Sequence, residues 1–365
     1  EGLRMFKRRL RVILSGIKRY KGSPQEIGKQ IIEDCWKNKY FRTSTGHFRE
    51  FWTRDFGICT ESLLNLGYKK KVYSTLRYAL KVFSRHNKVT TTITPYNYPF
   101  DFPTYSPDSL PFLVRSLRLL GNRDLIDQYK DFLNKEINRF YDIVLDKETG
   151  LVRKDRAFSS IKDHSMRKSA LYDNIMAAML DNDLKKIRIL NNSLKNYNFK
   201  KNIRDNFWTG EYFLDDLSGK KYMAGDANTF PYYCGVFTSK VMIKSSMRKI
   251  EEEGLDKPFP LKYTKASRMD NEFFLTKLIS PNYEGNTNWI HLGLCYINVV
   301  SKVDRQKAGK YLREYTPLIN RYRNFLEVFN NNRTPYQNPF YYCDEGMLWV
   351  ADYLDAKTSF LSGES

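Results

Sequence analysis

The sequence predicts an all-α domain built of stacked helical hairpins. Segments with apolar residues at helical spacing alternate with turns and with long loops rich in aromatic residues, whereas segments with strand periodicity are few and short. Glycine and proline separate the helical segments, as at Gly22-Ser23-Pro24, Gly67 and Gly121. We therefore expect helices to form the body of the molecule and the long loops to carry its chemistry at one end.

The helices can be placed along the chain from this pattern. Ser23 and Pro24 provide a cap and a first-turn proline for the second helix. The pattern predicts helices at residues 3–20, 24–35, 55–66, 70–85, 109–119, 171–180, 184–194, 230–250, 288–299, 304–322 and 345–353. One further helix follows the break at 121–124 and ends at about residue 141. Between them it predicts an extended loop over 90–105, a turn with a short strand over 146–152, a loop over 154–167 and a small β-hairpin over 207–226.

Composition describes a globular protein with a strong positive charge. The chain has 365 residues, of which 41% are apolar, enough for one large domain or two ordinary ones. The formal charge of +20 would suit a polyanion-binding helical protein. Lys and Arg are, however, spread along the whole chain, and the sequence has no recognisable nucleic-acid-binding motif. We therefore predict that nucleic acid is not a partner.

The five cysteines are far apart and form no C-x-x-C pair, so neither a zinc site nor a disulfide framework is predicted. A reducing, cytoplasmic location follows as an expectation. No apolar run reaches the ~20 residues needed to span a bilayer, and we expect the first helix to pack on the body. Because the chain starts at Glu1, an earlier targeting segment stays an open alternative.

The segment Phe51–Gly57 combines aromatic residues with a charged pair. Trp52, Arg54 and Asp55 provide a flat apolar face beside polar donors and acceptors, the combination that a sugar ring requires. The alternative interpretation is a helix start, with Thr53 or Asp55 as its cap. The segment is the first candidate for a site that binds a hydroxyl-rich ligand.

Further segments follow it in an order typical of one family of enzymes. They are Asp163 with Tyr172-Asp173-Asn174-Ile175, Gly285-Asn286-Thr287-Asn288-Trp289, Phe325-Leu326-Glu327-Val328-Phe329-Asn330 and Asp344-Glu345-Gly346-Met347-Leu348-Trp349. Together with Trp52-Thr53-Arg54-Asp55, they resemble motifs of the six-hairpin glycosidases, which include glucoamylases, trehalases, neutral invertases and the glucosidase domain of glycogen-debranching enzymes. The chain departs from the family at Asp173, where Glu is usual, and at Ile161-Lys162, where an aromatic residue often precedes the acid.

The resemblance implies a single (α/α)6 toroid over residues 1–365 and an inverting hydrolase of an α-linked glucan or oligosaccharide. It assigns Asp163 as general acid and Glu327 as general base. Because the four histidines do not share metal-ligand spacing and the sequence has no Gly-rich phosphate loop, we predict no metal and no cofactor. The residues that the resemblance places around the sugar are Trp52, Arg54, Asp55, Asp173, Asn174, Asn288 and Trp289.

The residues themselves are compatible with this chemistry. Hydrolysis requires one protonated and one ionised carboxyl group, and the apolar neighbours of Glu327 can desolvate it. Arg167 and Lys168 should point away from Asp163, because a general acid must hold its proton. The reserve carboxylates are Asp108, Asp173, Asp226, Glu284 and Glu345.

Simpler interpretations remain open at this stage. Asp163 would be the N-cap of a helix, Glu327 a solvated carboxylate in a helix over 321–329, and Trp289 ordinary core. At the level of function, the alternative is a carbohydrate-binding protein of the same fold that has lost turnover.

Overall fold

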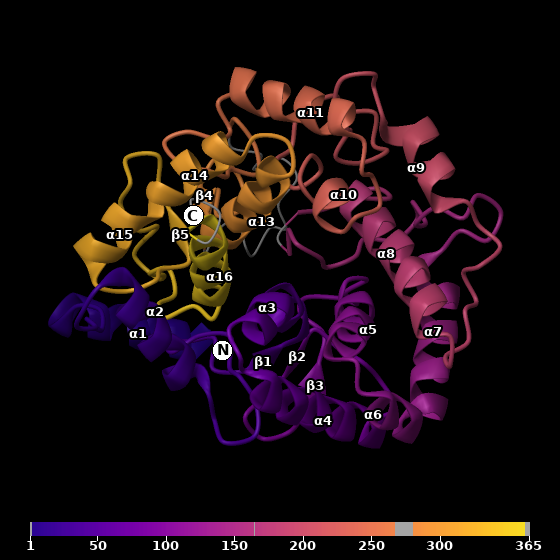
Figure 1. Ribbon diagram of the computed structural model, residues 1–365, viewed down its shortest axis with the longest axis horizontal. Helices are drawn as coiled ribbons and strands as arrows, with labels where there is room; N and C mark the ends of the chain where they lie inside the picture. Colours follow the sequence, from indigo (N-terminus) through magenta and orange to yellow (C-terminus); the bar gives the residue numbers. More distant parts are fainter. Residues whose placement is uncertain (1, 164, 267–279, 362–365) are drawn as a thin grey trace.

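Two concentric rings of helices make up the body of the molecule (Figure 1). The computed structural model describes residues 2–163, 165–266 and 280–361. The inner ring consists of α3 (Thr53–Asn65), α5 (Ser109–Leu120), α8 (Leu171–Ile187), α10 (Phe230–Tyr233), α13 (Ile290–Ser301) and α16 (Val350–Leu361). Each of these helices contacts the next, and α16 contacts α3, so the ring is closed.

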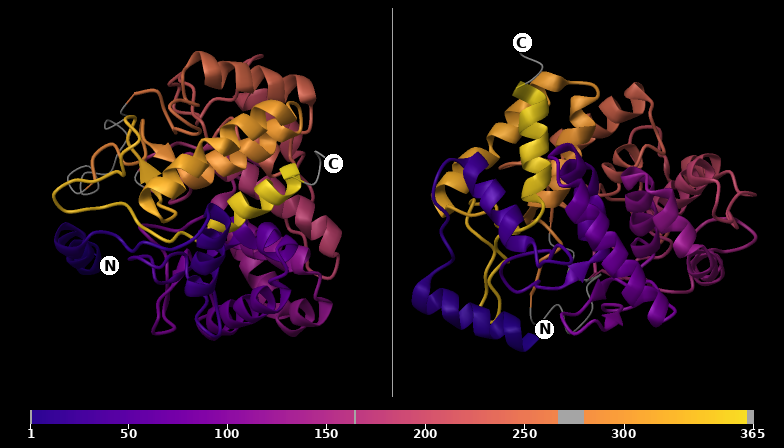
Figure 2. Two further views of the ribbon diagram at one scale, coloured as in Figure 1. Left: turned by 60° about the vertical axis from the view of Figure 1, so that its left-hand side comes forward. Right: turned by 60° about the horizontal axis from the view of Figure 1, so that its bottom comes forward.

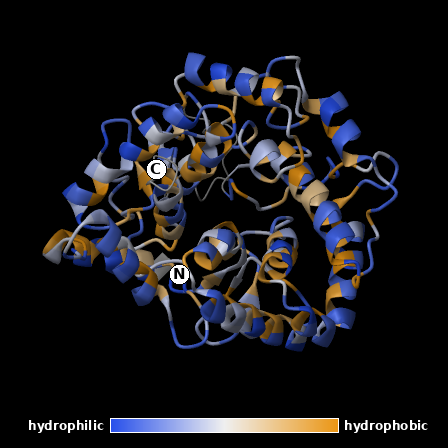
Figure 3. Ribbon diagram, in the orientation of Figure 1, coloured by the Kyte–Doolittle hydropathy of each residue, from blue (hydrophilic) through white to orange (hydrophobic). Residues whose placement is uncertain are grey.

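The outer ring packs around the inner one. It consists of α2 (Pro24–Cys35), α4 (Lys69–Arg85), α7 (Lys130–Val144), α9 (Phe199–Phe207), α11 (Lys240–Glu252) and α14 (Arg305–Arg313). Hydrophilic and hydrophobic residues alternate along these helices, as expected for amphipathic helices that bury one side (Figure 3). Since outer and inner helices alternate along the chain, the described helices give the predicted all-α (α/α)6 toroid.

Three other helices of the described residues lie outside this alternation. Two short ones, α6 (Arg123–Gln128) and α15 (Tyr315–Tyr322), precede α7 and follow α14. The first helix, α1 (Gly2–Ser15), lies at the periphery in both views of Figure 2. Its Arg8 is buried and pairs with Asp344 and Glu345, so α1 is fixed to the body as expected. Within the described ranges, none of the helices combines the length and the apolar content required to cross a bilayer.

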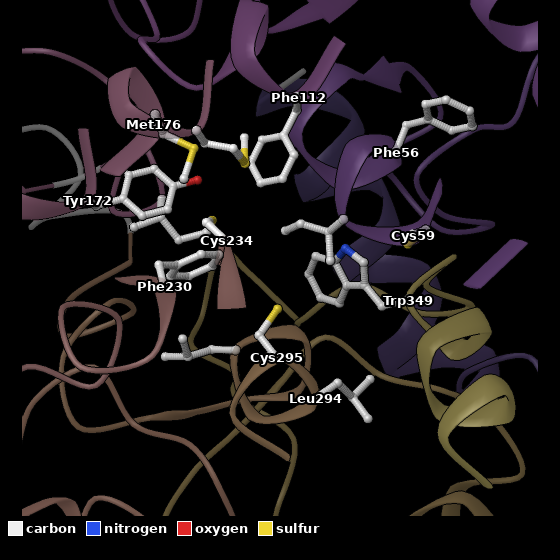
Figure 4. Close-up of a cluster of buried hydrophobic side chains, with 14 of the residues drawn as sticks. Phe56, Cys59, Phe112, Tyr172, Met176, Phe230, Cys234, Leu294, Cys295 and Trp349 are labelled. Atoms are coloured by element: carbon white, nitrogen blue, oxygen red, sulfur yellow. The ribbon is translucent and has the colours of Figure 1, made fainter. Parts of the chain in front are cut away.

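Local sequence explains how several helices begin and approach one another. Ser23 and Glu26 form the capping box of α2, with Pro24 in its first turn as predicted. Gly57 allows α3 to approach α5 closely, because a Cβ atom there would lie 2.4 Å from the Cβ of Phe112. Inside the ring, Tyr172 and Phe230 pack edge to face at 4.8 Å, in the cluster of hydrophobic side chains drawn in Figure 4.

Short strands precede two of the inner helices. Strand β1 (Phe51–Trp52) leads into α3 and pairs antiparallel with β2 (Thr92–Ile93), which pairs with β3 (Pro99–Phe100). Strand β4 (Asn288–Trp289) leads into α13 and pairs antiparallel with β5 (Val328–Phe329). In the predicted hairpin region, isolated bridges join Trp208 to Phe213 and Leu214 to Met223.

Some predicted helix boundaries were wrong. The segment 230–250 contains two helices, because the chain turns at Gly235, whose φ is 73°. The helix predicted at 184–194 does not form; α8 instead continues to Ile187 and ends at Arg188, whose φ is 63°. The last helix starts at Val350 and not at Glu345.

Candidate active site

The predicted site residues lie at one end of the toroid. Because the inner helices alternate with outer ones along the chain, they run in the same direction and their N-termini meet at the same end. Trp52, Arg54 and Asp55 lie at the start of α3, Asp173 and Asn174 in the first turn of α8, and Asn288 and Trp289 just before α13. The partial positive charge of helix N-termini favours carboxylates there.

Arg54 connects three segments at this end. Its Nη1 lies 3.1 Å from Asp108 Oδ2, and its Nη2 lies 2.8 Å from Asp163 Oδ2. Nη1 also donates a hydrogen bond to the carbonyl oxygen of Ser160. Arg54 is buried, so in this structure its guanidinium holds protein groups and is not open to a ligand.

Asp163 lies in the long loop between α7 and α8. Besides Arg54, its carboxylate accepts a hydrogen bond from Ser159 Oγ at 2.6 Å, and its backbone N–H donates to Glu284 Oε1 at 2.9 Å. Its side chain is 14% exposed, so the carboxylate is partly accessible to solvent. The interpretation of Asp163 as a helix N-cap is wrong, because α8 begins only at Leu171.

Two cations near Asp163 in sequence, Lys162 and Arg167, pair with other carboxylates. His164 lies outside the described residues. Arg167 lies 3.4 Å from Asp226 Oδ2 and 3.8 Å from Asp215 Oδ1. Lys162 Nζ is 2.8 Å from Asp215 Oδ1 and 3.2 Å from Asp226 Oδ1. This buried cluster attaches the loop that carries Asp163 to the segment before α10, so Lys162 has an anchoring role where an aromatic residue was expected.

Glu327 is a buried carboxylate held by three donors. Tyr283 donates to Oε1 at 2.5 Å, while the Tyr341 hydroxyl and the Asp344 backbone N–H each donate to Oε2 at 2.8 Å. Burial raises the pKa of Glu327 to about 7, and the charge of Asp344 acts in the same direction. The interpretation of Glu327 as a solvated helix end is wrong, because α15 ends at Tyr322 and Glu327 is 2% exposed.

Asp55 is fixed by the segment that closes the ring. Trp349 Nε1 donates to Asp55 Oδ1 at 3.0 Å, which joins the start of α3 to the start of α16. Burial raises the pKa of Asp55 to about 6. Trp52 is also buried and packs edge to face on Phe48 and Phe102, at 5.4 Å and 6.4 Å.

Asn174 is a supporting residue in this structure, although the sequence placed it in contact with the sugar. It is fully buried, its amide oxygen accepts the Val152 N–H at 2.8 Å, and its amide nitrogen donates to Ala170 O at 2.8 Å. Its polar atoms therefore bind backbone groups behind the site. Asp173 is buried beside Arg167, and burial raises the pKa of Asp173 to about 7.

Trp289 and Asn288 are buried in β4, which pairs with the strand that directly follows Glu327. Trp289 Nε1 donates to the Tyr283 carbonyl oxygen at 2.9 Å, and its ring packs edge to face on the Tyr283 ring at 4.7 Å. Asn288 donates to Asn331 Oδ1 at 3.3 Å. Trp289 thus orients the tyrosine that binds Glu327, whereas the sequence placed both residues around the sugar.

Several residues of the site were not predicted. Asp108 and Glu284 were reserve carboxylates, but nothing in the sequence assigned Ser159, Tyr283 or Tyr341. Ser159 precedes Asp163 by four residues, and Tyr283 directly precedes the Glu284-Gly285 pair. Their proximity to the motifs was the only available signal, and the contacts themselves are between segments distant in sequence.

Comparisons with known proteins give matches in structure alone. No protein-family model matches the sequence, and no curated protein matches it either. A rhamnosidase from Klebsiella oxytoca with rhamnose bound superposes with a TM-score of 0.66 and 11% identity, over 94% of this chain and 65% of the rhamnosidase.

Two further structures match over nearly their whole length. A GH63 mannosylglycerate hydrolase from Thermus thermophilus, in complex with Tris and D-glycerate, has a TM-score of 0.65 at 10% identity, over 92% of this chain and 100% of that one. A glycosidase variant in complex with glucose has a TM-score of 0.68 at 10% identity, over 99% and 98% of the two chains. The chain therefore has the (α/α)6 fold of the six-hairpin glycosidases, as its motifs predicted.

Proposed function

We propose that this protein is an inverting glycoside hydrolase that acts on an α-linked glucan or oligosaccharide. The fold that it shares with structures described as glycosidases supports the reaction class. The observation that carries the proposal is the environment of Glu327, a buried carboxylate held by Tyr283, Tyr341 and the Asp344 N–H.

Glu327 has the properties of a general base. Its three hydrogen bonds fix both carboxylate oxygens, and burial raises its pKa to about 7. A base with a pKa near the working pH removes a proton from water efficiently and is still ionised in a large fraction of molecules. In an inverting enzyme this water lies between the two carboxyl groups, ~6.5–9.5 Å apart.

Asp163 is the proposed general acid. It lies in the loop before α8, which is opposite α16 in the closed inner ring, and Glu327 lies in the segment that leads to α16. The two carboxyl groups are held from one segment, because Tyr283 donates to Glu327 and Glu284 accepts the Asp163 N–H. We propose that the sugar binds between them, with its leaving oxygen towards Asp163 and the attacking water towards Glu327. For Asp163 to deliver a proton, substrate must replace its contact with Arg54, and we propose that Arg54 then turns to the sugar.

The proposed sugar contacts are those at the start of α3. Trp52 and Asp55 are held in place by their neighbours, Asp55 through Trp349, so the two side chains are preorganised. Asp173, Asn174, Asn288 and Trp289 are proposed to support these groups from behind. A cytoplasmic location is also proposed, supported by the five cysteines, all of which are buried and unpaired.

The test is a screen of purified protein on maltooligosaccharides, trehalose, sucrose and debranched glycogen. Release of reducing sugar from one of them, with the initial product anomer of inverted configuration by NMR, is the expected result. Hydrolysis with retained configuration would reject inversion, and no release from any α-linked substrate would reject the substrate class.

A second function is favoured by one observation, the ion pair between Arg54 and Asp163. If Arg54 stays on Asp163 when sugar is present, the protein binds carbohydrate and does not turn it over. Calorimetry and product analysis on the same sugar separate the two functions: heat of binding without product selects the second.

A further inference from the structure

A basic groove runs along the outer side of α4, away from the residues proposed for catalysis. Its volume is about 560 Å³. It is formed by one face of α4, by the loop after α2 and by the turn between β2 and β3. The residues that line it are Lys39, Tyr73, Ser74, Arg77, Tyr78, Lys81, Val82, Arg85, His86 and Asn97.

The cations of this groove are unpaired in the part of the chain that the structure describes. Lys39, Arg77, Lys81 and Arg85 are exposed and make no ion pair with a described residue, and none of the lining residues is acidic. Arg77, Lys81 and Arg85 follow one another at intervals of four residues, so they form a row on one face of α4 and repel one another. An anion bound along the row would remove this repulsion.

Ordered aromatic rings lie beside the row of cations. Tyr78 stacks on Tyr40 with ring centres 4.5 Å apart and 10° between the planes, and its hydroxyl donates to Asn97 Oδ1 at 3.0 Å. Tyr98 packs edge to face on His86 at 5.7 Å. Tyr96, which directly precedes Asn97 in the turn, is 90% exposed.

The groove is connected to the proposed active site through a sheet. The turn that carries Tyr96 and Asn97 joins β2 to β3, and β2 pairs with β1 in the register Trp52 to Thr92. Strand β1 leads directly into Arg54 and Asp55. Because Phe51 pairs with Ile93, the turn that borders the groove lies next to the start of β1, and the sheet joins the groove to the strand that leads into α3.

We propose that this groove binds an anionic saccharide, a chain of sugar units that carry carboxylate, sulfate or phosphate groups. Guanidinium groups bind such anions with two parallel hydrogen bonds, and the tyrosine rings provide flat faces for the sugars. The choice of a saccharide over another polyanion rests on the proposed function. The groove then holds acidic segments of a substrate or of a matrix in which the substrate occurs.

The test measures binding directly by fluorescence anisotropy. The probes are a labelled sulfated hexasaccharide and a labelled hexagalacturonate, with neutral maltohexaose and an oligothymidylate of equal charge for comparison. The test variant is Arg77→Gln/Lys81→Gln/Arg85→Gln. The control variant, Lys135→Gln/Lys195→Gln/Lys244→Gln, removes the same charge from exposed lysines that form no ion pair with a described residue.

The acidic hexasaccharides should bind the wild type. The three substitutions of the test variant should raise the Kd at least about tenfold. They should also reduce the slope of log Kd against log salt concentration by about three. The control variant should change Kd by less than about twofold. No binding by the wild type, or equal losses in both variants, would overturn the proposal. Oligothymidylate that binds as tightly and responds equally to the test variant would identify a nucleic-acid site instead.

Because this measurement needs no turnover, its outcome is independent of the screen for hydrolysis. If the groove does not bind the acidic hexasaccharides, the catalytic proposal is unaffected. If the protein hydrolyses none of the screened sugars, the binding result can still be interpreted.

Discussion

Arg54 Nη2 lies 2.8 Å from Asp163 Oδ2, so the arginine expected to hold the sugar pairs with the expected general acid in this structure. The same guanidinium lies 3.1 Å from the fully buried Asp108. Arg54 therefore joins the starts of α3 and α5 to the loop before α8, which carries the proposed general acid. Its substitution should affect stability as well as activity.

Arg54→Gln should lower the free energy of unfolding by about 3–5 kcal/mol, because it leaves buried carboxylates without their cation. Urea denaturation at neutral pH measures the change. The control is Arg248→Gln, which removes a pair with Glu211 in which both side chains are more than half exposed; it should cost less than about 1 kcal/mol. Equal small losses in both variants would show that Arg54 does not bridge these segments.

Catalysis should depend on the ionisation of Glu327. Since burial raises its pKa to about 7, Glu327 is protonated and unable to act as a base at lower pH. We expect kcat/KM to fall roughly tenfold per pH unit below this value, while the free enzyme stays folded. An acidic limb centred near the ordinary value of 4.5 would mean that Glu327 is not the titrating base.

The same buried carboxyl should reduce stability at alkaline pH. A carboxyl whose pKa is raised by folding contributes stability below its unfolded pKa, and this contribution is lost as pH rises through the folded pKa. Glu327→Gln should therefore raise the free energy of unfolding above pH 7 and change it little below pH 4.5.

Asp352→Asn is the matched control. Burial raises the pKa of Asp352 to about 8, but this residue lies in the first turn of α16 facing Cys59, outside the proposed catalytic groups. It should also stabilise the protein at alkaline pH and leave kcat unchanged. Denaturation series at several pH values, with kcat at each, distinguish the two variants; destabilisation of both above pH 8 would contradict the account.

Lys162 should be needed to place Asp163. Lys162→Met removes the cation that lies within 3.2 Å of both Asp215 and Asp226, and frees the loop that carries the acid. We expect a loss of about 3–5 kcal/mol in unfolding free energy, and a lower kcat at temperatures where the variant is folded. The control is Lys201→Met, which removes an exposed ion pair with Asp205 and should change the free energy of unfolding and kcat only slightly. A folded Lys162→Met enzyme with normal kcat would show that the loop does not need this anchor.

The sequence predicted the fold because helical segments alternate with turns and long loops, and because several inner helices begin at motifs with a recognisable composition. Trp52, Asp173 and Trp289 mark the starts of three of them, and their order along the chain identified the toroid. The break between α10 and α11 was missed because Gly235 lies in an otherwise continuous apolar pattern, and its positive φ becomes evident only in three dimensions.

Within the site, the identities of the two proposed catalytic carboxylates came from the sequence, but their partners did not. Contacts such as Tyr341 to Glu327 or Arg54 to Asp163 join segments that are 14 and 109 residues apart. Local pattern contains no information about such contacts, which depend on how the loops fold over the end of the ring. For the same reason Asn174 was placed with the sugar, although it binds backbone groups behind the site.

The kcat of Glu327→Gln, measured on the best substrate of the screen, tests the central claim most directly. As a general base, Glu327 contributes roughly 10²- to 10⁴-fold to the rate, so kcat should fall by this factor with KM nearly unchanged. Azide should restore turnover to Glu327→Ala, because this small anion can enter the space left by the carboxylate. It then attacks the anomeric carbon in place of the activated water, while the bond to the leaving oxygen breaks and Asp163 protonates that oxygen. The control is Glu345→Gln, since Glu345 is buried against Arg8 and Arg11 and has a structural role. An unchanged kcat in Glu327→Gln, with a large loss in Glu345→Gln or Glu284→Gln, would contradict the account and assign the base elsewhere.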